Sequence, residues 1–214
     1  KAAVVTDNGV QIQDVPTPSP KPNEVLVRVK ACGLNRADLM VASGMAHGRA
    51  GGAGTVVGLE FVGEVAELGA EAKAQSGLQV GDRVMCGGAQ GWAEYAVADW
   101  GRAAKIPDGN VSWNEAATLP TALNTMHNAV VTAGRMQADE NVLIQGASSG
   151  VGLMAMQIAK HKGASLVIGT STNAERREKL KEYGADLPLD SKDPSWADQV
   201  LEATGGEGVD LIVD

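Results

Sequence analysis

The sequence predicts an α/β protein in which a domain of short β-strands precedes a domain of alternating strands and helices. Up to about residue 100, short stretches rich in Val and Ala are separated by turn residues, as in a small barrel or sandwich. After Pro107-Asp108-Gly109, strand and helix patterns alternate, which is typical of βαβ units and a parallel sheet. We expect the two domains to cover residues 1–112 and 113–214.

The composition indicates a folded protein with an acidic surface. Hydrophobic residues make up 44% of the chain, charged residues 21%, and the net charge is −8. This balance argues against nucleic-acid or anionic-membrane partners, which select a basic face. No apolar run reaches the ~20 residues of a membrane helix. Cys32 and Cys86 do not suggest a disulfide scaffold, and no signal-peptide pattern opens the chain, so we expect a cytoplasmic protein.

The first domain contains six candidate strands. The segment 24–31 largely alternates apolar and polar residues, as a half-buried strand does. Four prolines between positions 16 and 22 predict an extended linker before it. The candidate strands are residues 2–5, 10–15, 24–31, 59–68, 82–86 and 92–98.

The second domain alternates helices and strands up to the last residue. Ser112 is placed to cap a helix from Trp113, and Pro120 begins a second helical stretch to Val131. The following strands are expected at 140–146, 165–170, 186–190 and 209–214, with helices to about 161, at 173–183 and at 193–204. Right-handed crossovers then predict the Rossmann strand order 3-2-1-4. Since the chain stops in the fourth strand, we expect it to be part of a longer protein whose open edge would otherwise pair with another chain. A natural four-stranded variant is the alternative.

A glycine-rich loop lies between a predicted strand and a predicted helix. It is Gly146-Ala-Ser-Ser-Gly150-Val-Gly152, and its small residues allow backbone N–H groups to approach a pyrophosphate at the helix N-terminus. A plain tight turn is the alternative. In this βαβ setting we favour a dinucleotide site.

The end of the second strand distinguishes between the two nicotinamide cofactors. An NAD site needs an acidic residue roughly 20 positions after the glycines, to bind the ribose 2′-hydroxyl. The segment 169–173 offers hydroxyls and an amide instead, and Arg176 follows. These groups would hold a 2′-phosphate, so NADPH is the expected cofactor. Glu175 and Glu178 interleave with the bases, so a solvated helix face of mixed charge is the alternative.

These features resemble the zinc-independent quinone oxidoreductases, the zeta-crystallin-like branch of the medium-chain dehydrogenase/reductase superfamily. The segments that carry the resemblance are 31–40, 58–65, 80–84 and 146–152. The resemblance implies an N-terminal GroES-like β-barrel domain followed by a truncated Rossmann doubly wound parallel sheet. It also implies that NADPH and substrate bind between the domains, and that the full-length protein is a homodimer.

The resemblance also bears on metals. Zinc-dependent relatives have Cys, His and Cys ligands at the positions of Asn35, Leu59 and Thr121, none of which suits zinc. The segment 86–91 holds one cysteine where a structural zinc site needs four. We therefore expect no metal site. The three histidines are dispersed and are expected to be surface or packing residues: His47, His127 and His161.

Site residues follow from the matched positions. Asn35 is the catalytic candidate near the nicotinamide, although a structural amide tying strand to loop is an equal alternative. The expected cofactor-binding residues are Asn35, Thr125, Ser149, Gly150, Val151, Gly152, Thr170, Ser171, Thr172, Asn173 and Arg176. Met40 stands where several relatives have a tyrosine, which excludes a phenolic proton donor there. The loop 44–57 is rich in Gly and Ala, and we expect it to form an open, mobile pocket wall.

The expected reaction is hydride transfer from NADPH to a quinone or an α,β-unsaturated carbonyl, with Asn35 orienting or polarising and solvent supplying the proton. An enoyl-thioester reductase on the same fold, and a non-catalytic NADPH-binding redox sensor or structural protein, are open alternatives. A short-chain dehydrogenase is excluded because residues 1–145 precede the glycine loop. In addition, neither Tyr95 nor Tyr183 begins a Tyr-x-x-x-Lys motif.

Overall fold

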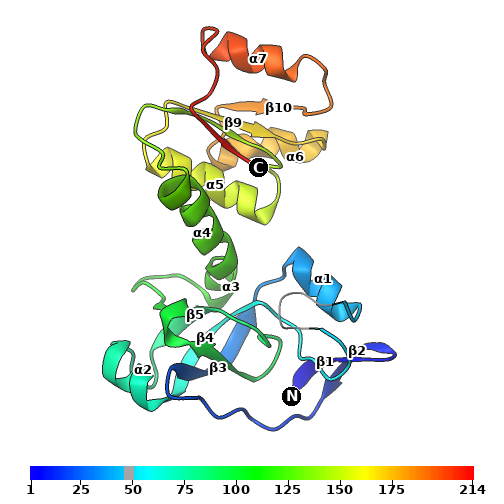
Figure 1. Cartoon of the computed structure of the whole chain (residues 1–214), viewed down its shortest axis with the longest axis vertical. Coiled ribbons are helices and arrows are strands. Elements are labelled where there is room, and N and C mark those ends of the chain that lie inside the picture. The colour runs from blue at the N-terminus through cyan, green and yellow to red at the C-terminus, as the bar shows by residue number, and fades with distance from the viewer. Residues whose placement is uncertain (46–50) are drawn as a thin grey trace. The chain divides into compact units, whose positions relative to one another are not determined.

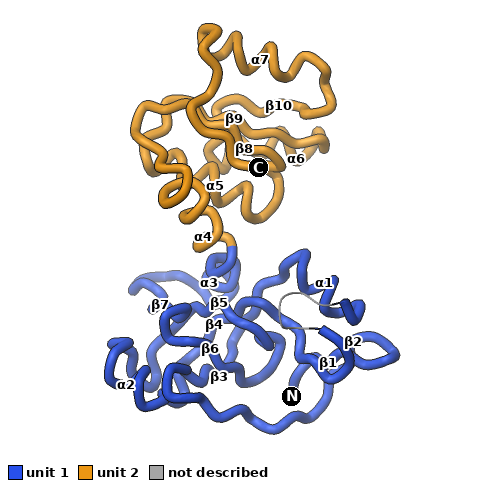
Figure 2. Tube along the Cα trace, in the orientation of Figure 1, with its two compact units in different colours: residues 1–121 blue, residues 122–214 orange. Residues whose placement is uncertain are grey.

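The computed structural model describes residues 1–45 and 51–214, and it divides into two compact units, Lys1–Thr121 and Ala122–Asp214 (Figure 2). The division falls within helix α4 (Pro120–His127), later than the expected boundary at 112/113. The reason is helix α3 (Trp113–Ala117), whose Ala116 and Ala117 pack with Val62 of the first unit. As expected, Ser112 caps this helix, and its Oγ accepts the backbone N–H of Glu115 at 3.2 Å.

A five-stranded antiparallel sheet forms the first unit, in the order β6-β3-β4-β5-β7. Its long central strands are β3 (Glu24–Cys32) and β4 (Glu60–Leu68), and Val25 and Val27 of β3 pack in one core with Phe61 and Val65 of β4. The other strands are β5 (Arg83–Gly87), β6 (Tyr95–Asp99) and β7 (Ala103–Lys105). A separate hairpin pairs β1 (Ala2–Thr6) with β2 (Gly9–Gln13).

Two short helices of this unit were not expected from the sequence. They are α1 (Arg36–Ala42), directly after β3, and α2 (Ala70–Gln75), directly after β4. Leu39 and Met40 of α1 are exposed, at 68% and 40%, so the helix has no continuous apolar stripe that a sequence pattern could reveal. The loop expected at 44–57 is described only in part: residues 46–50, including His47, lie outside the described residues.

The second unit is a four-stranded parallel sheet in the order β10-β9-β8-β11. In chain order this is 3-2-1-4, so the predicted Rossmann order is confirmed. The strands are shorter than expected: β8 (Asn141–Ile144), β9 (Leu166–Thr170), β10 (Leu187–Leu189) and β11 (Leu211–Val213).

Helices cover both faces of this sheet (Figure 1). Helix α5 (Gly150–His161) packs on Val142 and Ile144 of β8, whereas the cluster around α7 (Trp196–Ala203) contains Leu143. Alternate residues of β8 are therefore buried on opposite faces, as in doubly wound sheets. Helix α6 (Ala174–Lys179) and the π-helical segment Asn128–Ala133 complete the unit. Among the described residues, no helix is long and apolar enough to cross a membrane.

Candidate functional site

The glycine loop joins β8 to α5, and two kinds of glycine shape it. Gly146 has φ +59°, and a Cβ placed on Gly146 or Gly150 would meet no atom within 4 Å. A Cβ on Gly152 would lie 2.6 Å from Cα of Ala147, so the helix could not pack this closely against the loop. The loop thus combines open space beside its backbone with a close helix contact, which is the geometry of a pyrophosphate-binding turn.

The N-terminus of α5 offers donors to an anion. Ser149 caps the helix, and its Oγ accepts the backbone N–H of Gly152 at 3.1 Å. Within the described residues, the N–H groups of Gly150 and Val151 have no acceptor. These donors stand at the positive end of a 12-residue helix, where a phosphate group is stabilised.

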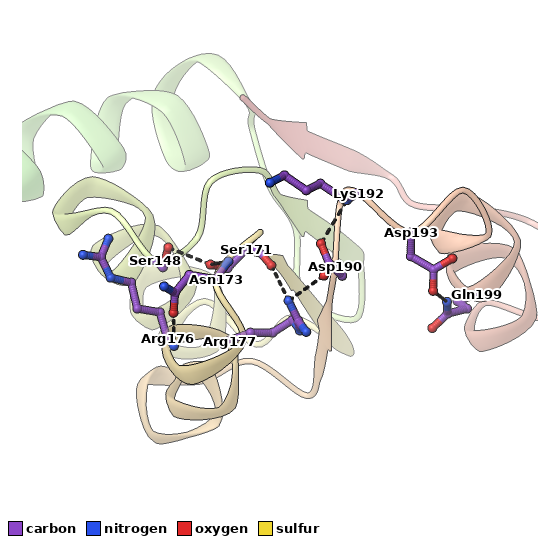
Figure 3. A network of polar contacts seen from close by, with 9 residues as sticks. All are labelled: Ser148, Ser171, Asn173, Arg176, Arg177, Asp190, Lys192, Asp193 and Gln199. Carbon is purple, nitrogen blue, oxygen red and sulfur yellow. Dashed lines mark hydrogen bonds and ion pairs between the residues drawn. The ribbon is translucent and has the colours of Figure 1, made fainter.

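Thr170 and Ser171, at the end of β9, hold the loop in place. Both are buried, at 2% and 5% exposure. Thr170 Oγ1 accepts the backbone N–H of Gly146 at 3.2 Å, and the Ser171 hydroxyl donates to Oγ of Ser148 at 2.9 Å (Figure 3). The sequence assigned both hydroxyls to the cofactor, but in the structure they are bonded to the glycine loop. The next two residues, Thr172 and Asn173, are exposed.

The arginines of α6 differ in their surroundings, although in the sequence they form one basic cluster. The Arg177 guanidinium donates to the carbonyl of Ser171 at 2.8 Å and lies 3.0 Å from Oδ2 of Asp190 (Figure 3). Arg176 is exposed and forms no ion pair in the described part of the chain. Its backbone N–H donates to Oδ1 of Asn173 at 2.9 Å, which keeps residues 173 and 176 together at the helix start.

A second polar cluster lies in the first unit, around Asn35. Nδ2 of Asn35 donates to Oε1 of Glu60 at 2.7 Å, and its backbone N–H donates to Oδ2 of Asp38 at 2.7 Å. Glu60 begins β4 and is only 4% exposed. Its other oxygen, Oε2, accepts the backbone N–H of Thr121 at 2.8 Å. One buried carboxylate therefore joins β4 to the start of α1 and to the start of α4.

Gly33 provides the space for this carboxylate. A Cβ at position 33 would lie 2.2 Å from Oε1 of Glu60 and 2.6 Å from the carbonyl oxygen of Ala117. Gly33 and Asn35 belong to the segment 31–40 and Glu60 to the segment 58–65, so two segments that carry the family resemblance meet here. Sequence reasoning missed Glu60. The available signal was an acidic residue beside Phe61 and Val62 at the start of an apolar strand.

The three residues that match zinc ligands of zinc-dependent relatives have other surroundings in this structure. Asn35 and Thr121 are linked through Glu60, while Leu59 is half-buried. Among the described residues, no group of three or more His, Cys, Asp or Glu side chains could hold a metal ion. Burial, with smaller contributions from Asp38 and Glu60, raises the pKa of the Cys32 thiol, which disfavours its thiolate form.

Thr125 is exposed on α4, within the second unit. His127 and His161 are exposed, each near the end of its helix.

Two family models match the chain: the alcohol dehydrogenase GroES-like domain over residues 21–108, and the zinc-binding dehydrogenase over residues 150–214. A probable oxidoreductase from Mycobacterium abscessus has a similar structure, with 34% identity and a TM-score of 0.85 over 100% of this chain and 68% of that one. The chain belongs to the medium-chain dehydrogenase/reductase superfamily. A mycobacterial quinone oxidoreductase shows 32% identity and a TM-score of 0.86 over 100% of this chain and 66% of that one. The predicted quinone oxidoreductase branch and the GroES-like and Rossmann fold classes are thus confirmed.

This member of the superfamily is also similar to parts of much larger proteins. A phenolphthiocerol/phthiocerol polyketide synthase from Mycobacterium tuberculosis is 35% identical over 207 residues, which are 97% of this chain and 9% of that protein. The CurK enoyl reductase structure has 27% identity and a TM-score of 0.87, over 100% of this chain and 66% of that one. The chain therefore spans less than a tenth of the curated polyketide synthase and about two thirds of the solved structures.

Proposed function

We propose that this chain carries the NADPH-binding and catalytic residues of a reductase that delivers hydride to a conjugated acceptor without zinc. The acceptor is a quinone or a carbon–carbon double bond conjugated to a carbonyl. The observation that carries the proposal is the cluster around Asn35. A neutral amide bonded to a buried glutamate stands at the position that the family resemblance matches to a zinc-ligating cysteine. In such a site, hydrogen bonds rather than a metal orient the reactants.

The second unit fits NADPH. The N–H groups of Gly150 and Val151 would hold the pyrophosphate, and Thr172, Asn173 and Arg176 would surround the 2′-phosphate. We assign Thr170 and Ser171 to holding the glycine loop. A mycobacterial protein that is 32% identical to this chain, with a TM-score of 0.85, has been solved in complex with NADPH. When bound, NADPH supplies the hydride.

The first unit contributes Asn35 and its neighbours to the binding of the cofactor and the acceptor. One amide N–H of Asn35 is bonded to Glu60, and its side chain also takes part in the capping box of α1, so the second N–H and one lone pair of Oδ1 are left for the nicotinamide end of the cofactor or the acceptor. We assign Thr125 to the nicotinamide carboxamide on the basis of the family match. Met40 offers no proton, so solvent protonates the reduced product. A cytoplasmic homodimer is part of the proposal.

An enoyl-thioester reductase is the second candidate. It is favoured because 97% of this chain aligns with a polyketide synthase and because the CurK enoyl reductase shares the fold. Hydride addition to the β-carbon is the same chemical step for an enone and for an enoyl thioester. The two candidates therefore differ in the acceptor and share the site.

An NADPH-oxidation screen of the full-length protein tests both candidates. The panel contains simple quinones, enones and crotonyl thioesters, each compared by kcat/KM. A clear preference for quinones and enones supports the first candidate, and a preference for thioesters supports the second. NADPH binding without turnover of any acceptor would contradict both and indicate a non-catalytic NADPH-binding protein.

A further inference from the structure

We propose that Glu60 is a positioning residue that fixes the orientation of the Asn35 amide and so determines which atom Asn35 presents to the cofactor. The proposal rests on the function above only for what Asn35 contacts. The hydrogen bonds that set the orientation belong to the first unit alone.

The chemistry of the two groups allows one orientation. The two ends of an asparagine amide have nearly the same shape, so only their hydrogen-bond partners distinguish them. An ionised carboxylate can only accept, so Nδ2 of Asn35 must face Oε1 of Glu60, at 2.7 Å. Oδ1 of Asn35 is consequently turned away from Glu60.

Glu60 is itself held on several sides. Its second oxygen accepts the backbone N–H of Thr121 at 2.8 Å, and its side chain fills the space beside Gly33. The backbone of Asn35 is fixed separately, through its N–H bond to Asp38. The contact with Glu60 thus fixes Nδ2 of the side-chain amide, and the capping box with Asp38 at the start of α1 engages the side-chain oxygen as well as the main chain of Asn35.

The orientation decides the role of Asn35. An amide that donates to a carboxylate becomes a stronger acceptor at its own oxygen, because hydrogen bonds in a chain polarise one another. Oδ1 is suited to the N–H donors of a nicotinamide carboxamide, whereas a substrate carbonyl needs a donor. Of the two roles expected from the sequence, orienting or polarising, we therefore assign Asn35 to orienting the cofactor.

Glu60→Gln tests the positioning role, because glutamine keeps the shape of glutamate but replaces one acceptor oxygen with a donor NH₂ group. The single side-chain oxygen of the introduced glutamine can still accept the N–H of Thr121, and its NH₂ group then faces Asn35. Asn35 must turn so that its Oδ1 accepts from this NH₂ group, which presents Nδ2 to the cofactor instead. The contacts with Asn35 and Thr121 are kept, so we expect only a small fall in the thermal midpoint, from the lost capping contact with Asp38, and a higher Kd for NADPH, because a donor now faces the nicotinamide carboxamide.

The expected kinetic effect is a fall in kcat of about 10- to 100-fold, the range for a misplaced reactant. The double variant Asn35→Asp/Glu60→Gln should recover most of this loss, because the introduced carboxylate accepts from the introduced amide and again presents an oxygen to the cofactor. Glu67→Gln is the matched control: Glu67 lies on the same strand, is exposed and forms no ion pair in the described part of the chain.

A readout without catalysis keeps the two proposals separate. The side-chain amide signal of Asn35 in an NMR spectrum of the ¹⁵N-labelled full-length protein is identified by its loss in Asn35→Asp. It should shift in Glu60→Gln and stay in place in Glu67→Gln. An unchanged signal and unchanged kcat in Glu60→Gln would overturn the positioning role, as would a double variant no more active than the single one. If the wild-type protein reduces no acceptor, the proposed function fails, while the NMR comparison still decides the role of Glu60.

Discussion

Removing the Arg176 side chain should weaken NADPH binding and leave NADH binding nearly unchanged. Arg176 is exposed and forms no ion pair in the described residues, so its charge is available to a 2′-phosphate. A charge-assisted hydrogen bond contributes about 1.5–3 kcal/mol, which corresponds to a factor of about 10 to 150 in Kd. Solvent screening at this exposed position places the expected loss near the lower end, at about tenfold.

Arg177→Ala is the matched control for this prediction. The Arg177 guanidinium is bonded to the Ser171 carbonyl and paired with Asp190, and Ser171 in turn holds the glycine loop. Its removal should therefore affect NADPH and NADH to the same extent, through the loop that both cofactors use.

The assay is a fluorescence titration of each variant with NADPH and with NADH, at fixed ionic strength. The ratio of the two Kd values is the measured quantity. Arg176→Ala should shift this ratio about tenfold toward NADH, and Arg177→Ala should leave it unchanged. Equal losses for both cofactors in Arg176→Ala, or a selective loss in Arg177→Ala alone, would refute the assignment of the 2′-phosphate site.

Three further predictions concern the loop, the metal and the thiols. Gly152→Ala should lower the thermal midpoint, because the added Cβ would lie 2.6 Å from Cα of Ala147. Gly150→Ala is the control and should leave the midpoint unchanged, because its Cβ would meet no atom within 4 Å. Equal midpoints for the two variants would contradict a close contact at Gly152. Elemental analysis of the full-length protein should find no stoichiometric zinc and chelators should leave turnover unchanged, whereas one tightly bound zinc per chain would show that Asn35 does not mark a metal-free site. Burial raises the pKa of Cys86 to about 12, so the thiol stays protonated and should resist alkylation at neutral pH in the folded protein; rapid labelling there before unfolding would contradict its burial.

The sequence predicted the second unit well because its signals are local. The glycine loop, the cap at Ser149 and the alternation of strands and helices can each be recognised within a few neighbouring residues. The strand order followed from the handedness of βαβ crossovers, which holds for nearly all such units. The end of the Rossmann strand β9 was also identified, along with the absence of a carboxylate there.

What the sequence could not show depends on contacts between distant residues. Arg176 and Arg177 are adjacent in the sequence. In the folded chain, Asp190, near the end of β10, pairs with Arg177, whereas Arg176 has no ion pair in the described residues. Glu60 resembles any acidic residue in a strand until its contacts with Asn35 and Thr121 are known. In the sequence, the hydroxyls of Thr170 and Ser171 suggested contacts with a ligand. Their burial and their hydrogen bonds to the glycine loop become visible only in the folded chain.

The central claim is zinc-free hydride transfer from NADPH to a conjugated acceptor, and isotope transfer tests it most directly. The full-length protein is treated with a chelator and supplied with NADPH that is deuterated at the transferring carbon, together with an enone and a crotonyl thioester. We expect saturated products with one deuterium at the β-carbon and a solvent-derived proton at the neighbouring carbon. Loss of turnover on chelation that zinc restores, or a product without deuterium at the β-carbon, would contradict it.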